Sequence, residues 1–379
     1  MEDSMTQEKL LKKEKILAFD YLRTFVIILV VLHHAILAYV TFIDYSGEYL
    51  VADIVPSTNL LNPIFDTAKS WVFDIILTIN DQYFMSLLFL LSGLFIYNSY
   101  ERKGTKKFFK DRFVRLGVPF LLFVPTIIPI AYYFAHLQWS INGNTALSFF
   151  GFWLEYAKAG FFASGPLWFL WVLLLFNLIV VLLFFRPKIE NRIKNLKIFE
   201  HPVYLFIALL LISTISFFPL LLIFGGSWIG VGPFTVQGSR VLHYFIFFLF
   251  GTFLGMYGLE KTMFKPNSSF TKFWWIYLII GLISFLFFFP LSCVSLSFAT
   301  IGFFLRYTKK RNLLMDSLNK NAFGIYIFHY MFIAGLQFIL LGINISAITK
   351  GIIVFFGALV LSWGFSSVFR KIPIVGRII

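Results

Sequence analysis

The stretch Phe19–Tyr39, FDYLRTFVIILVVLHHAILAY, decides the fold, because it is an apolar helix long enough to cross a bilayer. It nevertheless carries Asp20, Arg23, His33 and His34. The step from Arg23 to His34 is three helical turns plus about 20°, so both side chains lie on one face, roughly 16 Å apart. Because ionisable groups inside a membrane span are costly and mark functional sites, this helix is the first place to look for chemistry.

The composition of the whole chain excludes a soluble domain. Of 379 residues, 59% are apolar and 13% charged, and 52 are Phe. The sequence therefore predicts an all-α, polytopic transmembrane helical bundle, with residues 1–379 forming a single membrane domain. Cys293 is the single cysteine, which excludes an internal disulfide and a cysteine metal site, and no other residues have metal-ligand spacing.

Hydropathy predicts about ten spans. They fall near 16–42, 71–98, 114–136, 166–185, 201–224, 240–257, 321–342 and 348–369, with two more in a tight hairpin within 272–307. Of the 32 Lys and Arg residues, 28 fall in the N-terminal stretch, in alternate loops and in the C-terminal tail. By the positive-inside rule, both termini are expected in the cytoplasm.

The two adjacent histidines of the first helix are candidates for proton transfer. A neutral imidazole, with an ordinary pKa near 6.5, is a suitable general base, and His34 lies in the outer half of the span. The alternative is that His33 and His34 are hydrogen-bonded structural residues. Asp44, Asp66, Asp81 and Glu155 are the acids that could orient a catalytic histidine, and the sequence does not choose among them.

A basic run between 102 and 115 carries seven cations. Arg112 and Arg115 are three residues apart at the start of a predicted helix, so they can point together and bind phosphate as planar forks. A topology signal and contact with anionic lipid would require the same cations. In the ninth span, His329 could line the same cavity as Arg23 or be a structural histidine.

Small and aromatic residues mark further points. Ser92-Gly93 and Gly251-x-x-x-Gly255 are expected to be close-packing points between helices. Trp139, Trp153, Trp168 and Trp228 are expected in an aromatic belt at the outer interface, with the alternative that one or two stack on sugar rings.

Four stretches together resemble the membrane acyltransferase-3 superfamily, and specifically the branch of the glucans biosynthesis protein C. They are DYLRTFVIILVVLHHA, FMSLLFLLSGLF, FFKDRFVRLGVP and GPLWFLWVLLLF, in that order along the chain. NKNAFGIYIFH and the terminal RKIP are similar to that branch as well. The resemblance implies a ten-helix O-acyltransferase of the inner membrane.

That resemblance also implies site residues. His34, Arg23 and His33 are the expected catalytic residues, and Arg112, Arg115, Lys110 and His329 are the expected coenzyme-binding residues. The donor would be acetyl- or succinyl-coenzyme A as co-substrate, with no tightly bound cofactor and no metal. The acceptor would be a hydroxyl of an envelope glycan. The lipid bilayer is the remaining expected partner, and nucleic acid is not one.

A transporter or flippase for a glycan or lipid-linked sugar is the alternative function, since it would use the same ionisable helix as a gate or proton relay. Binding of coenzyme A distinguishes the two functions. An envelope scaffold is a third possibility, which has no need of a buried Arg and His.

Overall fold

The computed structural model describes residues 2–43, 49–51, 55–56, 64–141, 145–160, 163–264, 268–373 and 375–377. Its helices are α1 (Glu2–Ile36), α2 (Trp71–Leu94), α3 (Ile96–Arg112), α4 (Val118–Thr126), α5 (Ile128–Ser140), α6 (Phe149–Lys158), α7 (Trp168–Phe184), α8 (Pro187–Lys194), α9 (Pro202–Phe224), α10 (Val241–Tyr257), α11 (Ser269–Lys272), α12 (Trp274–Ser284), α13 (Phe289–Tyr307), α14 (Leu313–Leu340) and α15 (Ala347–Phe369). Short turns are η1 (Leu37–Tyr39), the π-helical η2 (Phe113–Gly117), η3 (Gly165–Leu167), η4 (Lys197–Glu200) and η5 (Val375–Arg377).

The protein is a helical membrane protein, as the composition predicts. Among the described residues, eight helical segments are long and apolar enough to cross a bilayer. Two of the ten expected spans correspond to shorter apolar helices, α10 with 17 residues and α12 with 11. The hairpin expected within 272–307 is formed by α12 and α13, and Pro290 lies in the first turn of α13, where its missing N–H has no cost.

The basic segment that the sequence places in a loop is helical instead. α3 runs through it to Arg112, and η2 and α4 continue the helix with a change of pitch. Gly104, at φ 69°, kinks the chain within α3, a conformation that glycine adopts at little cost. Hydropathy did not reveal this helix, because its residues are polar and mostly exposed.

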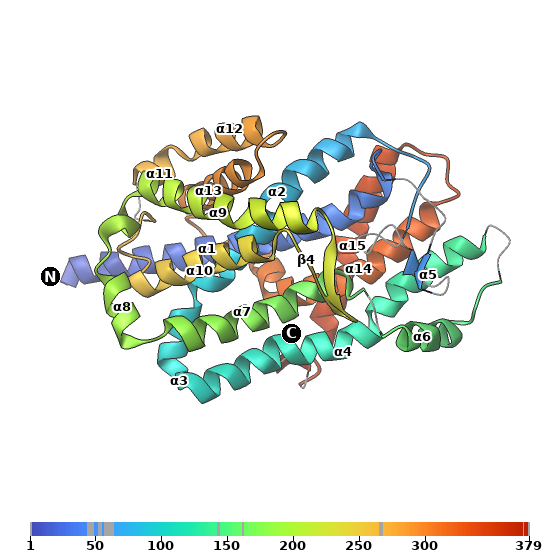
Figure 1. The fold of residues 1–379 in the computed structure, drawn as a ribbon, viewed down its shortest axis with the longest axis horizontal. Helices are drawn as coiled ribbons and strands as arrows, with labels where there is room; N and C mark the ends of the chain where they lie inside the picture. Colours follow the sequence, from blue (N-terminus) through green and yellow to red (C-terminus); the bar gives the residue numbers. More distant parts are fainter. Residues whose placement is uncertain are drawn as a thin grey trace.

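α1 is the central helix of the bundle. It packs against α2, α13, α14 and α15, and Figure 1 shows it running from the N-terminus along the long axis of the molecule. The apolar residues between its polar groups, such as Leu22, Val26 and Val31, are fully buried. The helix with the ionisable residues is therefore enclosed by its neighbours.

α2 and α10 pack in backbone contact. A Cβ on Gly251 would lie 2.1 Å from the Leu90 carbonyl oxygen, and one on Gly93 would lie 2.2 Å from that of Phe248. Gly255 approaches the Leu94 carbonyl as closely, at 2.2 Å. The expectation that these glycines are close-packing points is confirmed.

Two short antiparallel hairpins interrupt the helices: β1 (Tyr49–Val51) pairs with β2 (Val55–Pro56), and β3 (Trp228–Val231) pairs with β4 (Phe234–Gln237). The second hairpin forms in the glycine-rich stretch before α10. Gly230 is required there, since a Cβ would meet the Phe234 carbonyl oxygen at 2.0 Å. This hairpin brings Trp228 and Thr235 to the site described below.

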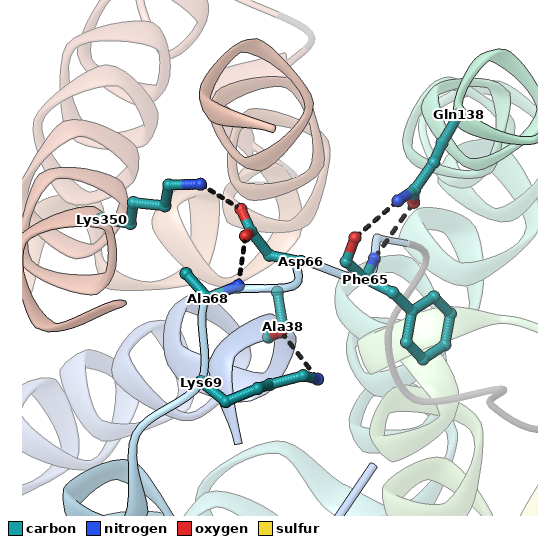
Figure 2. Close-up of polar contacts among 7 residues, drawn as sticks. All are labelled: Ala38, Phe65, Asp66, Ala68, Lys69, Gln138 and Lys350. Carbon is teal, nitrogen blue, oxygen red and sulfur yellow. Dashed lines mark hydrogen bonds and ion pairs between the residues drawn. The ribbon is translucent and has the colours of Figure 1, made fainter. Parts of the chain in front are cut away.

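The segment 64–70 returns from the hairpin of β1 and β2 to α2 and covers the end of α1. Asp66 Oδ2 accepts a hydrogen bond of 2.7 Å from Lys350 Nζ in α15, and both side chains are almost completely buried (Figure 2). Gln138 of α5 binds the backbone of Phe65 in both directions, at 3.1 and 2.5 Å. Lys69 Nζ donates to the Ala38 and Ile43 carbonyls, at 3.4 and 2.8 Å. These contacts fix the chain over the helix that carries the histidines.

Candidate active site

His33 and His34 are adjacent in α1 but face different neighbours. The His33 ring stacks on Phe84 of α2, with ring centres 4.9 Å apart. The His34 ring lies 5.3 Å from His329 and 5.3 Å from Tyr330, both in α14. Because successive residues of a helix are rotated by about 100°, one histidine contacts α2 and the other α14.

Polar contacts fix the register of α1 against α14. Gln337 Nε2 donates to the carbonyls of His34 and Ala35, at 3.2 and 3.1 Å. Elsewhere along the same two helices, the Tyr21 hydroxyl of α1 donates to Asp316 Oδ1 of α14 at 2.7 Å. The His34 ring is therefore held at a fixed height against α14.

The protonation of His329 follows from its hydrogen bond. Its Nδ1 lies 2.7 Å from the Tyr326 carbonyl oxygen, which can only accept, so Nδ1 carries the proton and Nε2 is an acceptor. Among the described residues, neither His329 Nε2 nor His34 Nδ1 has a hydrogen-bond partner, and both atoms are buried. The two rings are direct neighbours, with centres 5.3 Å apart.

His34 lines a small cavity of about 30 Å³. Its other walls are Ala163, Ser164, Gly165, Pro166, Trp168, Trp228, Thr235 and Tyr330. Trp168 and Trp228 contact one another edge to face at 5.7 Å, so these two tryptophans lie in the wall of the histidine site. A cavity of this size holds about two water molecules.

Asp81 is the candidate acid that the structure brings near His33. Its Oδ2 accepts a hydrogen bond of 2.6 Å from Arg240 Nη2, and the charges of both groups act on His33. The other described candidates have different partners: Asp66 pairs with Lys350, and Glu155 with Lys158. Asp44 lies outside the described residues. The partnership of Asp81 with Arg240 has no signal in the sequence, because 159 residues separate the two.

A group of arginines lies near the other end of the intramembrane part of α1. Arg23 and Arg115 both exert their positive charge on Arg112. The Arg23 guanidinium lies over the Phe95 ring at 5.5 Å and that of Arg112 over Phe108 at 5.0 Å. We call Arg23, Arg112 and Arg115 the arginine cluster. Among the described residues, Asp20 is the one carboxylate paired with it, at 3.7 Å from Arg23.

The arginine cluster retains most of its capacity to bind an anion. Among the described residues, neither Arg112 nor Arg115 forms an ion pair. The Arg23 side chain is 38% exposed. Planar guanidinium groups that already rest on aromatic faces lose little freedom on binding phosphate. Asp20 and Asp111 are carboxylates near these three arginines, so the cluster keeps a net positive charge that suits an anion.

The structure separates the other sequence candidates from the arginine cluster. Lys110 is exposed on α3 and is not among the charges that act on Arg112. His329 packs on His34 rather than with Arg112 and Arg115. Within the described ranges, no group of three or more His, Cys, Asp or Glu side chains could hold a metal ion.

Sequence reasoning missed three residues of the site. Ser164 and Tyr330 line the histidine cavity, and Gln337 fixes the backbone of His34. Tyr330 follows a candidate histidine and Ser164 precedes the GPLW motif, so proximity to a motif was the available signal. Gln337 gives no such signal.

Comparison with known proteins gives one finding. The model of the acyltransferase-3 family, described as an acyltransferase domain, matches residues 16–367. Searches of curated proteins and of solved structures find no match. The match runs from the start of the apolar part of α1 almost to the end of α15 and includes the arginine cluster and both histidines of the site.

Proposed function

The chain belongs to the acyltransferase-3 family, and on this premise we propose that it transfers an acyl group from cytoplasmic acyl-coenzyme A to a hydroxyl of an extracytoplasmic envelope glycan. Acyltransferase activity follows from the family; the donor, the acceptor and the residue roles are the proposal. We place the protein in the inner membrane with both termini in the cytoplasm, as the distribution of Lys and Arg favours.

One spatial relationship carries the proposal: an anion-binding arginine cluster and a histidine cavity lie at two heights of the same helix. Arg23 and His34 are roughly 16 Å apart along α1 by the helical rise. Coenzyme A has a similar division, with phosphates at one end and a thioester at the end of a long thin arm. The phosphates would bind Arg112 and Arg115, and the arm would pass Arg23 towards His34.

The chemistry then requires a base and a route for one proton. His34 accepts the proton of the acceptor hydroxyl as that oxygen attacks the thioester carbonyl carbon. The new C–O bond forms, the C–S bond breaks, and the proton passes from His34 to the departing thiolate. No net charge remains in the apolar site, and direct transfer needs no covalent enzyme intermediate.

His329 and His33 have supporting roles in this scheme. His329, with its proton fixed on Nδ1 by the Tyr326 carbonyl, presents Nε2 as an acceptor that orients His34. His33 stacks on Phe84 and is within the electrostatic influence of Asp81 and Arg240, so in this scheme it positions the end of the helix rather than the substrate. The resemblance of the sequence to the glucan-related branch favours succinyl as the acyl group, and acetyl is the alternative.

The test is binding and turnover by the purified protein in nanodiscs, with acetyl- and succinyl-coenzyme A compared side by side. Saturable binding and release of free coenzyme A are expected, and the better donor identifies the acyl group. The variant Arg112→Ala/Arg115→Ala should weaken binding of the coenzyme at least tenfold.

A matched control removes two cations of the same basic segment that are exposed on α3. The variant Lys106→Ala/Lys107→Ala should bind the coenzyme nearly as well as the unmodified protein. Equal losses in both variants would show nonspecific attraction instead of a site. A folded protein that binds neither donor nor free coenzyme A would contradict the acyl-coenzyme A proposal and leave transport as the function to test.

A further inference from the structure

Ser164 is a buried hydroxyl that no described residue satisfies. It is 1% exposed, its own carbonyl accepts a bond of 3.1 Å from the Leu167 amide, and its Oγ has no partner. Buried polar groups in proteins are nearly always hydrogen-bonded, because leaving one unsatisfied costs stability. An unsatisfied hydroxyl that lines a cavity therefore indicates a ligand there.

The backbone around Ser164 is held in an unusual conformation. Ala163 has φ 72° and Gly165 has φ 52°, so two left-handed residues flank the serine. Ala163 is a residue for which this conformation costs free energy. The loop is fixed by two tyrosines: Tyr156 donates to the Ala163 carbonyl at 2.6 Å, and Tyr326 donates to the Pro166 carbonyl. The direction of the Ser164 side chain is thus determined by surrounding structure.

Ser164 and His34 line the same cavity. Thr235 of β4 and Tyr330 of α14 also carry hydroxyls in that wall, and the Tyr330 hydroxyl is already hydrogen-bonded to Tyr132. Ser164 Oγ has no partner among the described residues and belongs to a residue that shares this cavity with the proposed general base, so it can serve as a donor there. A reaction at this cavity that develops negative charge on an oxygen atom requires such a donor.

We propose that Ser164 is a catalytic residue whose hydroxyl donates a hydrogen bond to the carbonyl oxygen of the acyl group during transfer. This inference rests on the proposed function. As the acceptor oxygen bonds to the carbonyl carbon and its proton passes to His34, the electron pair of the C=O bond moves onto the oxygen, where Ser164 stabilises it. The pair returns as the C–S bond breaks and the thiolate takes the proton from His34.

The test is steady-state kinetics of the full-length protein in nanodiscs with Ser164→Ala and, as a near-isosteric variant with a weak donor, Ser164→Cys. Loss of a single such donor lowers kcat by about 10²–10³-fold, and we expect this for Ser164→Ala. The dissociation constant of coenzyme A should change less than twofold, and stability should be unchanged or higher, because an unsatisfied hydroxyl is removed.

Ser295→Ala is the matched control. Ser295 is a fully buried serine of α13 whose Oγ also has no partner among the described residues, and it does not line the cavity. We expect wild-type kcat from this variant.

Wild-type kcat in both Ser164 variants would overturn the proposal. An acyl group found on Ser164 by intact mass would also overturn it, because the serine would then be a nucleophile. If the unmodified protein turned over no acyl-coenzyme A, the proposed function itself would be contradicted. The unmodified protein is measured before the variants, so this outcome is distinguished from a failure of the Ser164 proposal.

Discussion

The imidazole rings of His34 and His329 lie 5.3 Å apart although 295 residues separate them in the chain. His329 Nδ1 is hydrogen-bonded to the Tyr326 carbonyl, and its Nε2 and His34 Nδ1 are both buried without partners among the described residues. A backbone carbonyl therefore fixes one histidine, and that histidine is placed to orient the second. In the proposed mechanism, a carbonyl and a histidine take the place of the carboxylate that usually orients a catalytic histidine.

Replacing His329 distinguishes an orienting residue from a coenzyme ligand. We expect His329→Ala to lower kcat about 10–10²-fold with coenzyme A affinity within twofold of wild type, because the residue contacts His34 and not the arginine cluster. His329→Gln, which can still present an acceptor, should recover part of the loss. Steady-state kinetics and calorimetric binding measure both effects. A large loss of coenzyme affinity would place His329 in the coenzyme site instead.

His34 and His33 should differ in their effect on turnover. His34→Ala removes the proposed general base, for which a loss of about 10²–10⁴-fold in kcat is typical. His33→Phe keeps an aromatic ring against Phe84 and should lower kcat less than tenfold. The measurement is release of free coenzyme A, with thermal unfolding as a check on folding. A larger loss from His33→Phe than from His34→Ala would reverse the assignment.

Arg23 should act on the donor. Its guanidinium lies over Phe95 and beside Asp20 and is partly exposed, so it can contact the coenzyme as it passes. We expect Arg23→Gln to lower kcat/KM for acyl-coenzyme A about 10–100-fold, since a hydrogen bond to a charged group is worth about 1.5–3 kcal/mol. Arg23→Lys should retain part of the activity, because it keeps the charge but loses the planar fork. Equal activity in all three proteins would exclude this role.

The sequence predicted the class of fold and the helix that carries the site, because both follow from hydropathy and from ionisable residues within an apolar run. It predicted Arg23, Arg112 and Arg115 as candidates, and the structure brings these three together. It could not predict the neighbours of His34, since these depend on how α1 and α14 pack. Spacing within one helix carries no information about a contact between helices.

Two other features of the structure were not foreseen from the sequence, for physical reasons. The basic segment near Gly104 was expected to be a loop and is helical. A polar amphipathic helix gives no hydropathy signal, so the sequence pattern did not reveal it. Trp168 and Trp228 were expected in an aromatic belt, which stays a prediction, and the sequence did not indicate that both line the cavity with His34. The hairpin of β3 and β4, which carries Trp228 there, is short and rich in glycine, so its apolar residues are too few to stand out.

The backbone contact of α2 and α10 predicts that replacing a glycine at this contact destabilises the protein more than replacing a glycine with free space around it. In Gly251→Ala the new methyl group would lie 2.1 Å from the Leu90 carbonyl oxygen, so the helices must separate. We expect a loss of about 1–3 kcal/mol in the free energy of unfolding, as for other overpacked sites. Gly364→Ala in α15 is the control, because nothing lies within 4 Å of the added Cβ. Denaturant titration in detergent measures both, and equal stabilities would contradict the close packing.

The ion pair of Asp66 and Lys350 should be the one whose breakage costs most. The two side chains are 1% and 3% exposed, so Asp66→Asn leaves the Lys350 ammonium buried without a counter-charge (Figure 2). Removing one partner of a buried pair costs about 3–5 kcal/mol in the free energy of unfolding. The single oxygen of the asparagine can still accept the 2.8 Å bond from the Ala68 amide, but its NH2 group then faces Lys350, so the loss reports both the charge and the hydrogen bond to the ammonium.

Two further variants complete that test. Asp66→Leu/Lys350→Met removes both charges and should be much closer to wild type than Asp66→Asn, because an apolar replacement of a buried pair is often neutral. Glu155→Gln breaks the pair with Lys158, whose side chains are 37% and 70% exposed, and should cost no more than about 1 kcal/mol. Since segment 64–70 covers the end of α1, Asp66→Asn should also lower turnover, while the double variant retains it. Equal losses for Asp66→Asn and Glu155→Gln would show that the buried pair is accessible to water and does not anchor this segment.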